Sequence, residues 1–222
     1  MSRFLDGAMR AVFFDLDGTL VDTAPDLVDT LQALQRNRGV APVAYELGRS
    51  CASNGAMGLL RLGFPELDDT ARQSMLPEFL GRYGETLTAR SRLFAGLDAL
   101  LRELDDARVP WGIVTNKPAY LTGPLLEALE LTPRATCAIS GDTLPVRKPD
   151  PGPLLHACEL AGVECRQPRP ECARPWPVGR RTGFLGDQRH IYRCELGFWG
   201  SLLHLRRAQR RYLCRWGCQL SE

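Results

Sequence analysis

Two aspartates at the end of an apolar run are the residues best suited to chemistry in this chain of 222 residues. Asp15 and Asp17 follow the apolar residues 11–14, and Gly18 comes directly after them. An apolar run that stops at a polar, glycine-containing segment is typical of a buried strand that ends in a loop. Side chains two residues apart in an extended chain point to the same side, so we expect the two carboxylates to lie together.

A cation is expected between these carboxylates, because two like charges at short distance stay ionised only when an opposite charge joins them. Carboxylate oxygens are ligands for hard divalent cations, so the pattern predicts a Mg²⁺ site that includes Asp15 and Asp17. The alternative is a simple turn, since Asp-Gly pairs are common in turns. The apolar strand in front of the pair favours the functional interpretation.

Two later segments carry polar groups suited to a site, and those of the first segment can bind phosphate oxygens. Thr115 and Asn116 follow the apolar residues 111–114 and offer a hydroxyl and a backbone N–H at a strand end, although an ordinary strand-to-helix loop is the alternative. Lys148 lies among prolines in a chain that has two lysines against 26 arginines, which favours a role beyond a surface charge. Lys117, the other lysine, is expected to be peripheral.

The elements that must position these groups alternate along the chain. A helix is expected from Thr23, with Thr23 as its cap, and residues 43–90 have a mostly helical pattern. Strands over 111–115 and 137–140 then alternate with Leu-rich helices, which favours a parallel sheet covered on both faces. The predicted fold is α/β, a Rossmann-like parallel sheet core with an inserted all-helical cap domain. The core is expected to comprise residues 1–21 and 92–222, and the cap residues 22–91.

The segment Phe-Asp-Leu-Asp-Gly-Thr-Leu at residues 14–20 resembles the first motif of the haloacid dehalogenase superfamily, in the version that its phosphatases carry. The resemblance implies a phosphoric monoester hydrolase in which Asp15 is the nucleophile and forms an aspartyl-phosphate. Asp17 would protonate the leaving alkoxide and then activate the water that hydrolyses this intermediate. The phosphate-binding residues that it implies are Thr115, as the second motif, Asn116 beside it, and Lys148, which neutralises nucleophile and phosphate together.

A narrower resemblance covers residues 9–165. Residues 114–118 and 141–151 look like the corresponding segments of bacterial phosphoglycolate phosphatases. This implies the Mg²⁺-dependent hydrolysis of 2-phosphoglycolate to glycolate and phosphate, with Asn54-Gly55 or Arg61 of the cap as contacts for the acid. Two alternatives remain open: a phosphatase for a sugar phosphate such as N-acetylmuramate 6-phosphate, and a catalytically impaired member of the family.

The last quarter of the chain departs from this pattern. Residues 1–165 hold 16 Lys and Arg against 22 Asp and Glu, a net −6, whereas residues 166–222 hold 12 Arg against four acids, a net +8. In the family, an apolar strand ending in Gly-Asp belongs near residue 173, where two prolines in three residues exclude a central strand. Gly-Asp occurs later, and the resemblance makes Asp187 the third carboxylate of the Mg²⁺ site.

Composition also limits the setting. The chain has no run of about 18 apolar residues and a poor signal peptide, so we expect the cytoplasm, no membrane partner and eight cysteines as thiols. The cysteines of the last quarter lack the spacing of common zinc sites, and its arginines are interpreted as a solvated face rather than a nucleic-acid site. The expected partner is a small phosphorylated acid or sugar, and the chain is expected to be a monomer or a homodimer.

Overall fold

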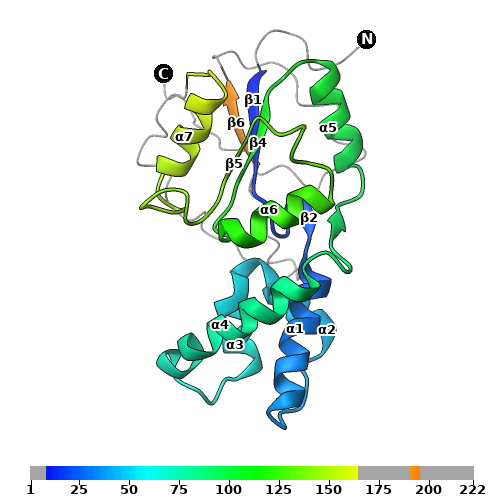
Figure 1. Cartoon of the computed structure of the whole chain (residues 1–222), viewed down its shortest axis with the longest axis vertical. Helices are drawn as coiled ribbons and strands as arrows, with labels where there is room; N and C mark the ends of the chain where they lie inside the picture. The colour runs from blue at the N-terminus through cyan, green and yellow to red at the C-terminus, as the bar shows by residue number, and fades with distance from the viewer. Residues whose placement is uncertain (1–8, 165–190, 196–222) are drawn as a thin grey trace, which may run out of the picture.

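The computed structural model describes residues 9–164 and 191–195 of the chain, which divide into a sheet with flanking helices and a separate group of helices (Figure 1). The main sheet of the described residues has the strand order β5-β4-β1-β6. Its strands are β1 (Met9–Phe14), β4 (Trp111–Val114), β5 (Cys137–Ile139) and β6 (Ile191–Glu195).

Three of these strands run parallel. Phe14 of β1 is paired with Ile113 of β4, and Val114 of β4 is paired with Ile139 of β5, so the carboxyl ends of the three strands meet at one edge. The predicted parallel sheet is confirmed for these strands. β6 joins the other side of β1 in the antiparallel direction, and its first residue, Ile191, pairs with Phe14.

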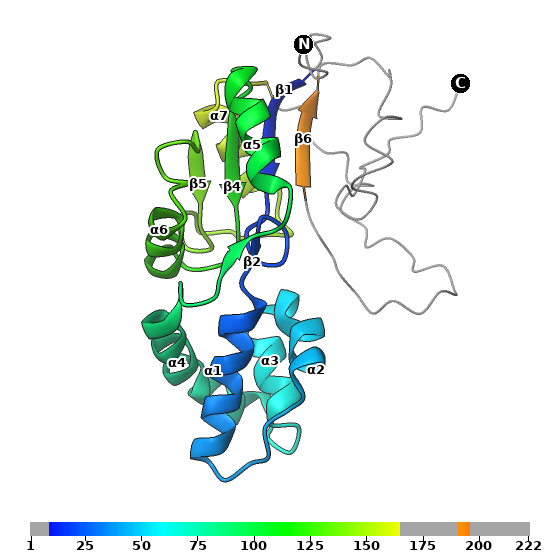
Figure 2. The ribbon, with the colours of Figure 1, turned by 90° about the vertical axis from the view of Figure 1, so that its right-hand side faces the viewer.

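Both faces of the sheet are covered, because side chains alternate between the faces along each strand. Val12 and Phe14 belong to one buried cluster, whereas Ala11 and Phe13 belong to another. The first cluster includes the buried leucines of α5 (Leu97–Asp106) and α6 (Ala119–Ala128), and the second includes Ala157 and Cys158 of α7 (Gly152–Leu160). Figure 2 shows α5 and α7 on opposite faces.

The second group of helices is inserted between two short strands. β2 (Val21–Asp22) and β3 (Arg92–Leu93) pair in the antiparallel direction, and all the residues between them form the helical layer below the sheet in Figure 1. The elements of this layer are α1 (Ala24–Asn37), α2 (Tyr45–Cys51), η1 (Ala52–Asn54), α3 (Gly55–Gly63) and α4 (Asp69–Thr86). The sequence therefore predicts the helical character of residues 43–90 well.

A buried carboxylate ties this layer to the returning chain. Asp26 of α1 is 1% exposed and accepts hydrogen bonds from the backbone N–H groups of Arg90 and Ser91 and from the Ser91 hydroxyl. A buried charge is stable only when several donors satisfy it. Asp26 thus fixes the segment that leads from α4 into β3.

Two further features bear on the predicted setting. Within residues 9–164 and 191–195, no helix is both long and apolar enough to cross a membrane. Cys51 and Cys137 are free thiols, whereas Cys158 is disulfide-bonded. The prediction that every cysteine is a thiol is therefore wrong at Cys158.

Candidate active site

The loop after β1 is tightly closed by its own backbone. The carbonyl of Leu16 accepts from the N–H groups of Leu20 and Val21, and the N–H of Gly18 donates to the carbonyl of Val21 at 2.9 Å. Gly18 has a φ of 75°, a left-handed conformation that glycine adopts without strain. The loop therefore holds Asp15 and Asp17 in fixed positions at the edge where the parallel strands end.

Asp15 is held at one of its two carboxylate oxygens. Its Oδ1 accepts from the Leu16 N–H at 2.8 Å and from the Lys148 ammonium at 2.8 Å, and its side chain is 18% exposed. Burial raises the pKa of Asp15 above its ordinary value, while the charge and hydrogen bond of Lys148 oppose this shift. No hydrogen bond to Oδ2 is found among the described residues, so no donor of the described chain occupies this oxygen.

Lys148 joins two strand ends. Besides Asp15, its ammonium contacts the carbonyl oxygen of Val114, the last residue of β4, at 2.8 Å. The side-chain amide of Asn116 donates to the Lys148 carbonyl at 3.0 Å. A Cβ on Gly141 would lie 2.2 Å from the Asn116 carbonyl oxygen, so only glycine allows these loops to approach so closely. The three segments predicted to form one site do converge.

Thr115 and Asn116 lie at the end of β4, and some of their polar groups are engaged within the chain. The N–H of Thr115 donates to the Ile139 carbonyl at 2.8 Å, and the Thr115 hydroxyl accepts from the Lys117 N–H at 3.2 Å. The backbone N–H of Asn116 has no acceptor among the described residues, and Asn116 is exposed. The group available to a phosphate oxygen is therefore the N–H of Asn116 rather than that of Thr115.

Asp17 is also held at one oxygen. Its Oδ1 accepts from the Thr23 hydroxyl at 2.7 Å and from the Lys117 ammonium at 3.1 Å. Thr23 does occupy the cap position of α1, but its side chain makes no capping hydrogen bond there. The prediction of a side-chain cap is wrong, because the hydroxyl donates to Asp17 instead.

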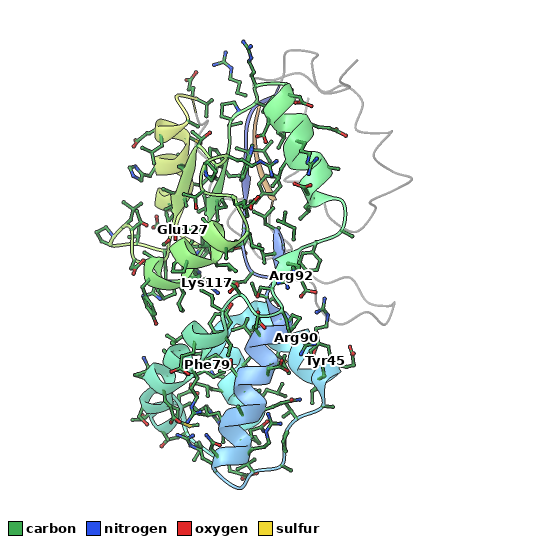
Figure 3. All side chains as sticks on the ribbon, turned by 45° about the vertical axis from the view of Figure 1, so that its right-hand side comes forward. Tyr45, Phe79, Arg90, Arg92, Lys117 and Glu127 are labelled. Carbon is green, nitrogen blue, oxygen red and sulfur yellow. The ribbon has the colours of Figure 1, made fainter. Side chains whose placement is uncertain are left out.

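Lys117 is the residue that sequence reasoning missed. It was expected at the periphery, yet its side chain is 5% exposed and its ammonium contacts both Asp17 and the Tyr83 hydroxyl, the latter at 2.9 Å. The ammonium also lies 4.4 Å from the centre of the Tyr83 ring. Figure 3 shows Lys117 where the sheet part meets the helical layer. Its rarity was the available signal, since both lysines of the chain pair with the two loop carboxylates.

Tyr83 brings α4 to this cluster. Its side chain is buried, and burial raises the pKa of its hydroxyl far above the ordinary value, with the negative charges of Asp17 and Asp26 adding to the shift. The phenol therefore stays neutral at any working pH and can accept a hydrogen bond from Lys117.

The helical side of the site includes the segment η1. A Cβ on Gly18 would lie 3.7 Å from the Cβ of Ser53, so the residue next to Asn54 is in contact range of the loop. Arg61, the other expected contact for an acid, is exposed and paired with Asp69 at 3.0 Å. The guanidinium of Arg61 is therefore engaged in an ion pair, whereas η1 reaches the loop that carries Asp17.

Asp15 and Asp17 are the carboxylates of the loop that are available to Mg²⁺. The described residues contain no group of three His, Cys, Asp or Glu side chains that could hold a metal. However, Mg²⁺ in proteins is commonly bound by one or two carboxylates together with substrate phosphate and waters. Asp15 and Asp17 supply such carboxylates from one loop, so the residues fit the ion. Asp187, the expected third ligand, lies outside the described residues.

Comparison with known proteins identifies the family of this site. A family model described as haloacid dehalogenase-like hydrolase matches residues 9–172, which includes the whole cluster. The chain belongs to this family. The match ends before most of the arginine-rich last quarter, so the family's pattern is carried by the sheet, the helical layer and the loops described above.

Relatives within the family share most of their length with this chain. A phosphoglycolate phosphatase of Xanthomonas campestris pv. campestris is 44% identical over 158 residues, which are 71% of this chain and 72% of the relative. An N-acetylmuramic acid 6-phosphate phosphatase of Pseudomonas putida is 38% identical over 159 residues, 70% of each chain. The crystal structure of a protein from Haemophilus somnus, described as a predicted phosphoglycolate phosphatase, is 27% identical with a TM-score of 0.61, over 70% of this chain and 72% of that chain.

Proposed function

We propose that this protein is a Mg²⁺-dependent phosphatase that hydrolyses 2-phosphoglycolate to glycolate and phosphate. The observation that carries the proposal is the pair of loop carboxylates, each bound to one lysine, in a chain 44% identical to a phosphoglycolate phosphatase. A buried nucleophile next to a fixed ammonium suits a phosphate ester, because the ammonium offsets the negative charge of both groups.

In the first chemical step, Asp15 Oδ2 attacks phosphorus. The bond from phosphorus to the leaving oxygen breaks, and the proton of neutral Asp17 moves to that oxygen, which leaves as the hydroxyl of glycolate. The products of the step are an aspartyl-phosphate on Asp15 and an ionised Asp17. Lys148, the Asn116 N–H and the Thr115 hydroxyl are the groups that we assign to the phosphoryl oxygens, and the Thr115 hydroxyl also accepts from the Lys117 N–H.

In the second step, a water molecule replaces Asp15 on phosphorus. Asp17 takes a proton from the attacking water, the bond between phosphorus and Asp15 Oδ2 breaks, and inorganic phosphate leaves. Both carboxylates then return to their starting protonation states, so the enzyme is regenerated. The rigid backbone of residues 15–21 keeps the two carboxylates in place through both steps.

Asp15 and Asp17 are the residues that would hold Mg²⁺, with Asp187 as the proposed third ligand. When bound there, the ion would supply positive charge to the phosphoryl oxygens. The proposed division of labour places the chemistry in a core of residues 1–21 and 92–222 and substrate selection in a cap of residues 22–91. The chain leaves the core at β2 and returns to it at β3, and this pair of crossings supports the division. A cytoplasmic location stays a prediction, as does a monomeric or homodimeric state.

The second candidate function is hydrolysis of N-acetylmuramate 6-phosphate, which the 38% identical relative favours. Comparing kcat/KM for the two esters in the presence of Mg²⁺ decides between them. We expect 2-phosphoglycolate to be preferred. A tenfold preference for the sugar phosphate, equivalent to about 1.4 kcal/mol of transition-state binding, would overturn the substrate assignment. Absence of turnover with either ester would instead indicate an impaired member of the family.

A further inference from the structure

The side chains of Lys117 and Tyr83 have no role in the steps assigned above, although the Lys117 ammonium contacts Asp17. Lys117 carries its charge at a side-chain exposure of 5%, where a lone ammonium is strongly unfavourable. Removing either member of a buried ion pair leaves the other charge uncompensated. The contact with Asp17 therefore matters to both residues, and it fixes how the Asp17 carboxylate is turned.

The two oxygens of Asp17 are not equivalent. Oδ1 accepts from both the Thr23 hydroxyl and the Lys117 ammonium, whereas Oδ2 has no donor among the described residues. Oδ2 is therefore the oxygen that is left to exchange a proton with a reacting group. A proton donor must be within hydrogen-bond reach of its acceptor, so this orientation is a condition for its action.

Tyr83 controls the position of Lys117. The ammonium of Lys117 donates to the Tyr83 hydroxyl at 2.9 Å and lies over the Tyr83 ring at 4.4 Å from its centre. Tyr83 belongs to α4, so this part of the cluster comes from the helical layer, whereas Asp17 and Lys117 come from the loops of the sheet. Loss of the Tyr83 hydroxyl removes one of the two side-chain hydrogen bonds that the ammonium donates among the described residues.

We propose that Lys117 and Tyr83 are positioning residues that turn Asp17 so that Oδ2 delivers its proton to the leaving oxygen. This inference rests on the proposed function, in which Asp17 is the proton donor. Neither residue needs to touch the substrate. Lys148, bound to Asp15, acts on the nucleophile instead, so the two lysines serve different parts of the same step.

The consequence is a dependence on the leaving group. An alkoxide such as that of glycolate is a poor leaving group and needs a proton as the bond to phosphorus breaks. p-Nitrophenolate is a stable anion and leaves without one. Loss of Asp17 positioning should therefore slow an alkyl phosphate much more than an aryl phosphate. A loss of folding or of phosphate binding would slow both esters alike.

The test compares kcat/KM for 2-phosphoglycolate and p-nitrophenyl phosphate. This constant covers the steps up to departure of the leaving group, so the later attack of water does not enter it. Lys117→Met keeps the length of the side chain and removes its charge, and Tyr83→Phe keeps the ring and removes its hydroxyl. The matched controls are Arg102→Met and Tyr120→Phe, which alter a side chain that is 73% exposed and a tyrosine that is 59% exposed.

We expect Lys117→Met to lower the value for 2-phosphoglycolate about 100-fold, within the usual range of general acid catalysis, and the value for p-nitrophenyl phosphate less than about fivefold. Tyr83→Phe should shift the ratio of the two values in the same direction by about tenfold. The controls should leave the ratio unchanged. The aryl activity of each variant also reports that its core is folded, and Tyr83→Phe carries the test if Lys117→Met does not fold.

Two outcomes would overturn the inference. Equal losses with both esters in an active protein would mean that Lys117 is structural or binds phosphate, and the proposed function would survive. A wild-type protein that hydrolyses neither ester would overturn the proposed function as well. If the wild-type protein prefers another alkyl phosphate, only the substrate assignment fails, and the ratio is then measured with that ester against p-nitrophenyl phosphate.

Discussion

Asp15 and Asp17 are bound in the same way, but the residues that bind them come from different parts of the molecule. Each carboxylate is bound at Oδ1 by one lysine and one other donor, with Oδ2 left open among the described residues. Around Asp15, both donors come from the sheet part, from the loop itself and from the segment before α7. Around Asp17, the lysine comes from the loop between β4 and α6, but Tyr83, which contacts this lysine, comes from the helical layer.

This difference separates two tasks. We call Asp15 with its donors the Asp15 half of the site, and Asp17 with Thr23, Lys117 and Tyr83 the Asp17 half. The Asp15 half is built from strands and loops of the sheet part, so its geometry does not depend on the position of the helical layer. The Asp17 half is complete only when α4 lies against the loop after β4. The nucleophile is positioned without the helical layer, whereas the proton donor is positioned with its help. Full activity toward alkyl esters would therefore require that the helical layer packs correctly against the sheet part.

The largest expected loss of activity comes from replacing the nucleophile, Asp15. Asp15→Asn should lower kcat/KM by at least about 10⁴-fold with alkyl and aryl phosphates alike, because an amide oxygen does not form the phosphoryl intermediate. Steady-state assays of both esters check this, with Asp106→Asn as the control, since Asp106 is exposed. Activity of the Asp15→Asn variant near that of the wild-type protein would exclude the mechanism.

The second effect comes from Lys148. Lys148→Met should lower kcat/KM about 100-fold with both esters, because it removes the charge that stabilises the ionised nucleophile and the phosphoryl group. The equal losses are what distinguish this lysine from Lys117. Arg147→Met, a change at the exposed neighbouring residue, is the matched control. A selective loss with the alkyl ester would show that the two lysines do not divide the work as proposed.

The Asp15 half could be predicted from the sequence because its residues lie in short motifs at strand ends. An apolar run followed by Asp-x-Asp-Gly is visible without a structure, and so is a lysine set among prolines. The parallel strands then bring these motifs to one edge, as the alternation of strands and helices predicts. Only local patterns and one topological rule were needed.

The Asp17 half could not be predicted, because its partners are chosen by packing between layers. Tyr83 lies 66 residues after Asp17, within an ordinary helix, and nothing in its neighbourhood marks it. Thr23 has the sequence signature of a helix cap, which concealed its contact with Asp17. Lys117 was expected to be peripheral, and its contacts with Asp17 and with Tyr83 of α4 make it part of the site.

The smallest expected effect on activity tests the attachment of the helical layer. Asp26→Asn should lower the free energy of unfolding by about 2–3 kcal/mol, because the amide nitrogen would face backbone N–H groups of Arg90 and Ser91 that now donate to a carboxylate. Urea unfolding measures this change. Asp29→Asn is the control, since Asp29 lies on the same helix and also binds Arg90, but through an exposed ion pair that should contribute nothing measurable.

The same variant connects stability with the two halves of the site. If the helical layer positions Asp17 through Tyr83, loosening residues 90–91 should lower the ratio of alkyl to aryl kcat/KM by a few-fold under conditions where the protein is still folded. The aryl activity should change little, because the Asp15 half does not involve α4. An unchanged ratio in a clearly destabilised Asp26→Asn variant would mean that α4 stays seated without this carboxylate. Tyr83 would then keep its contact with Lys117 through packing of α4 that does not depend on Asp26.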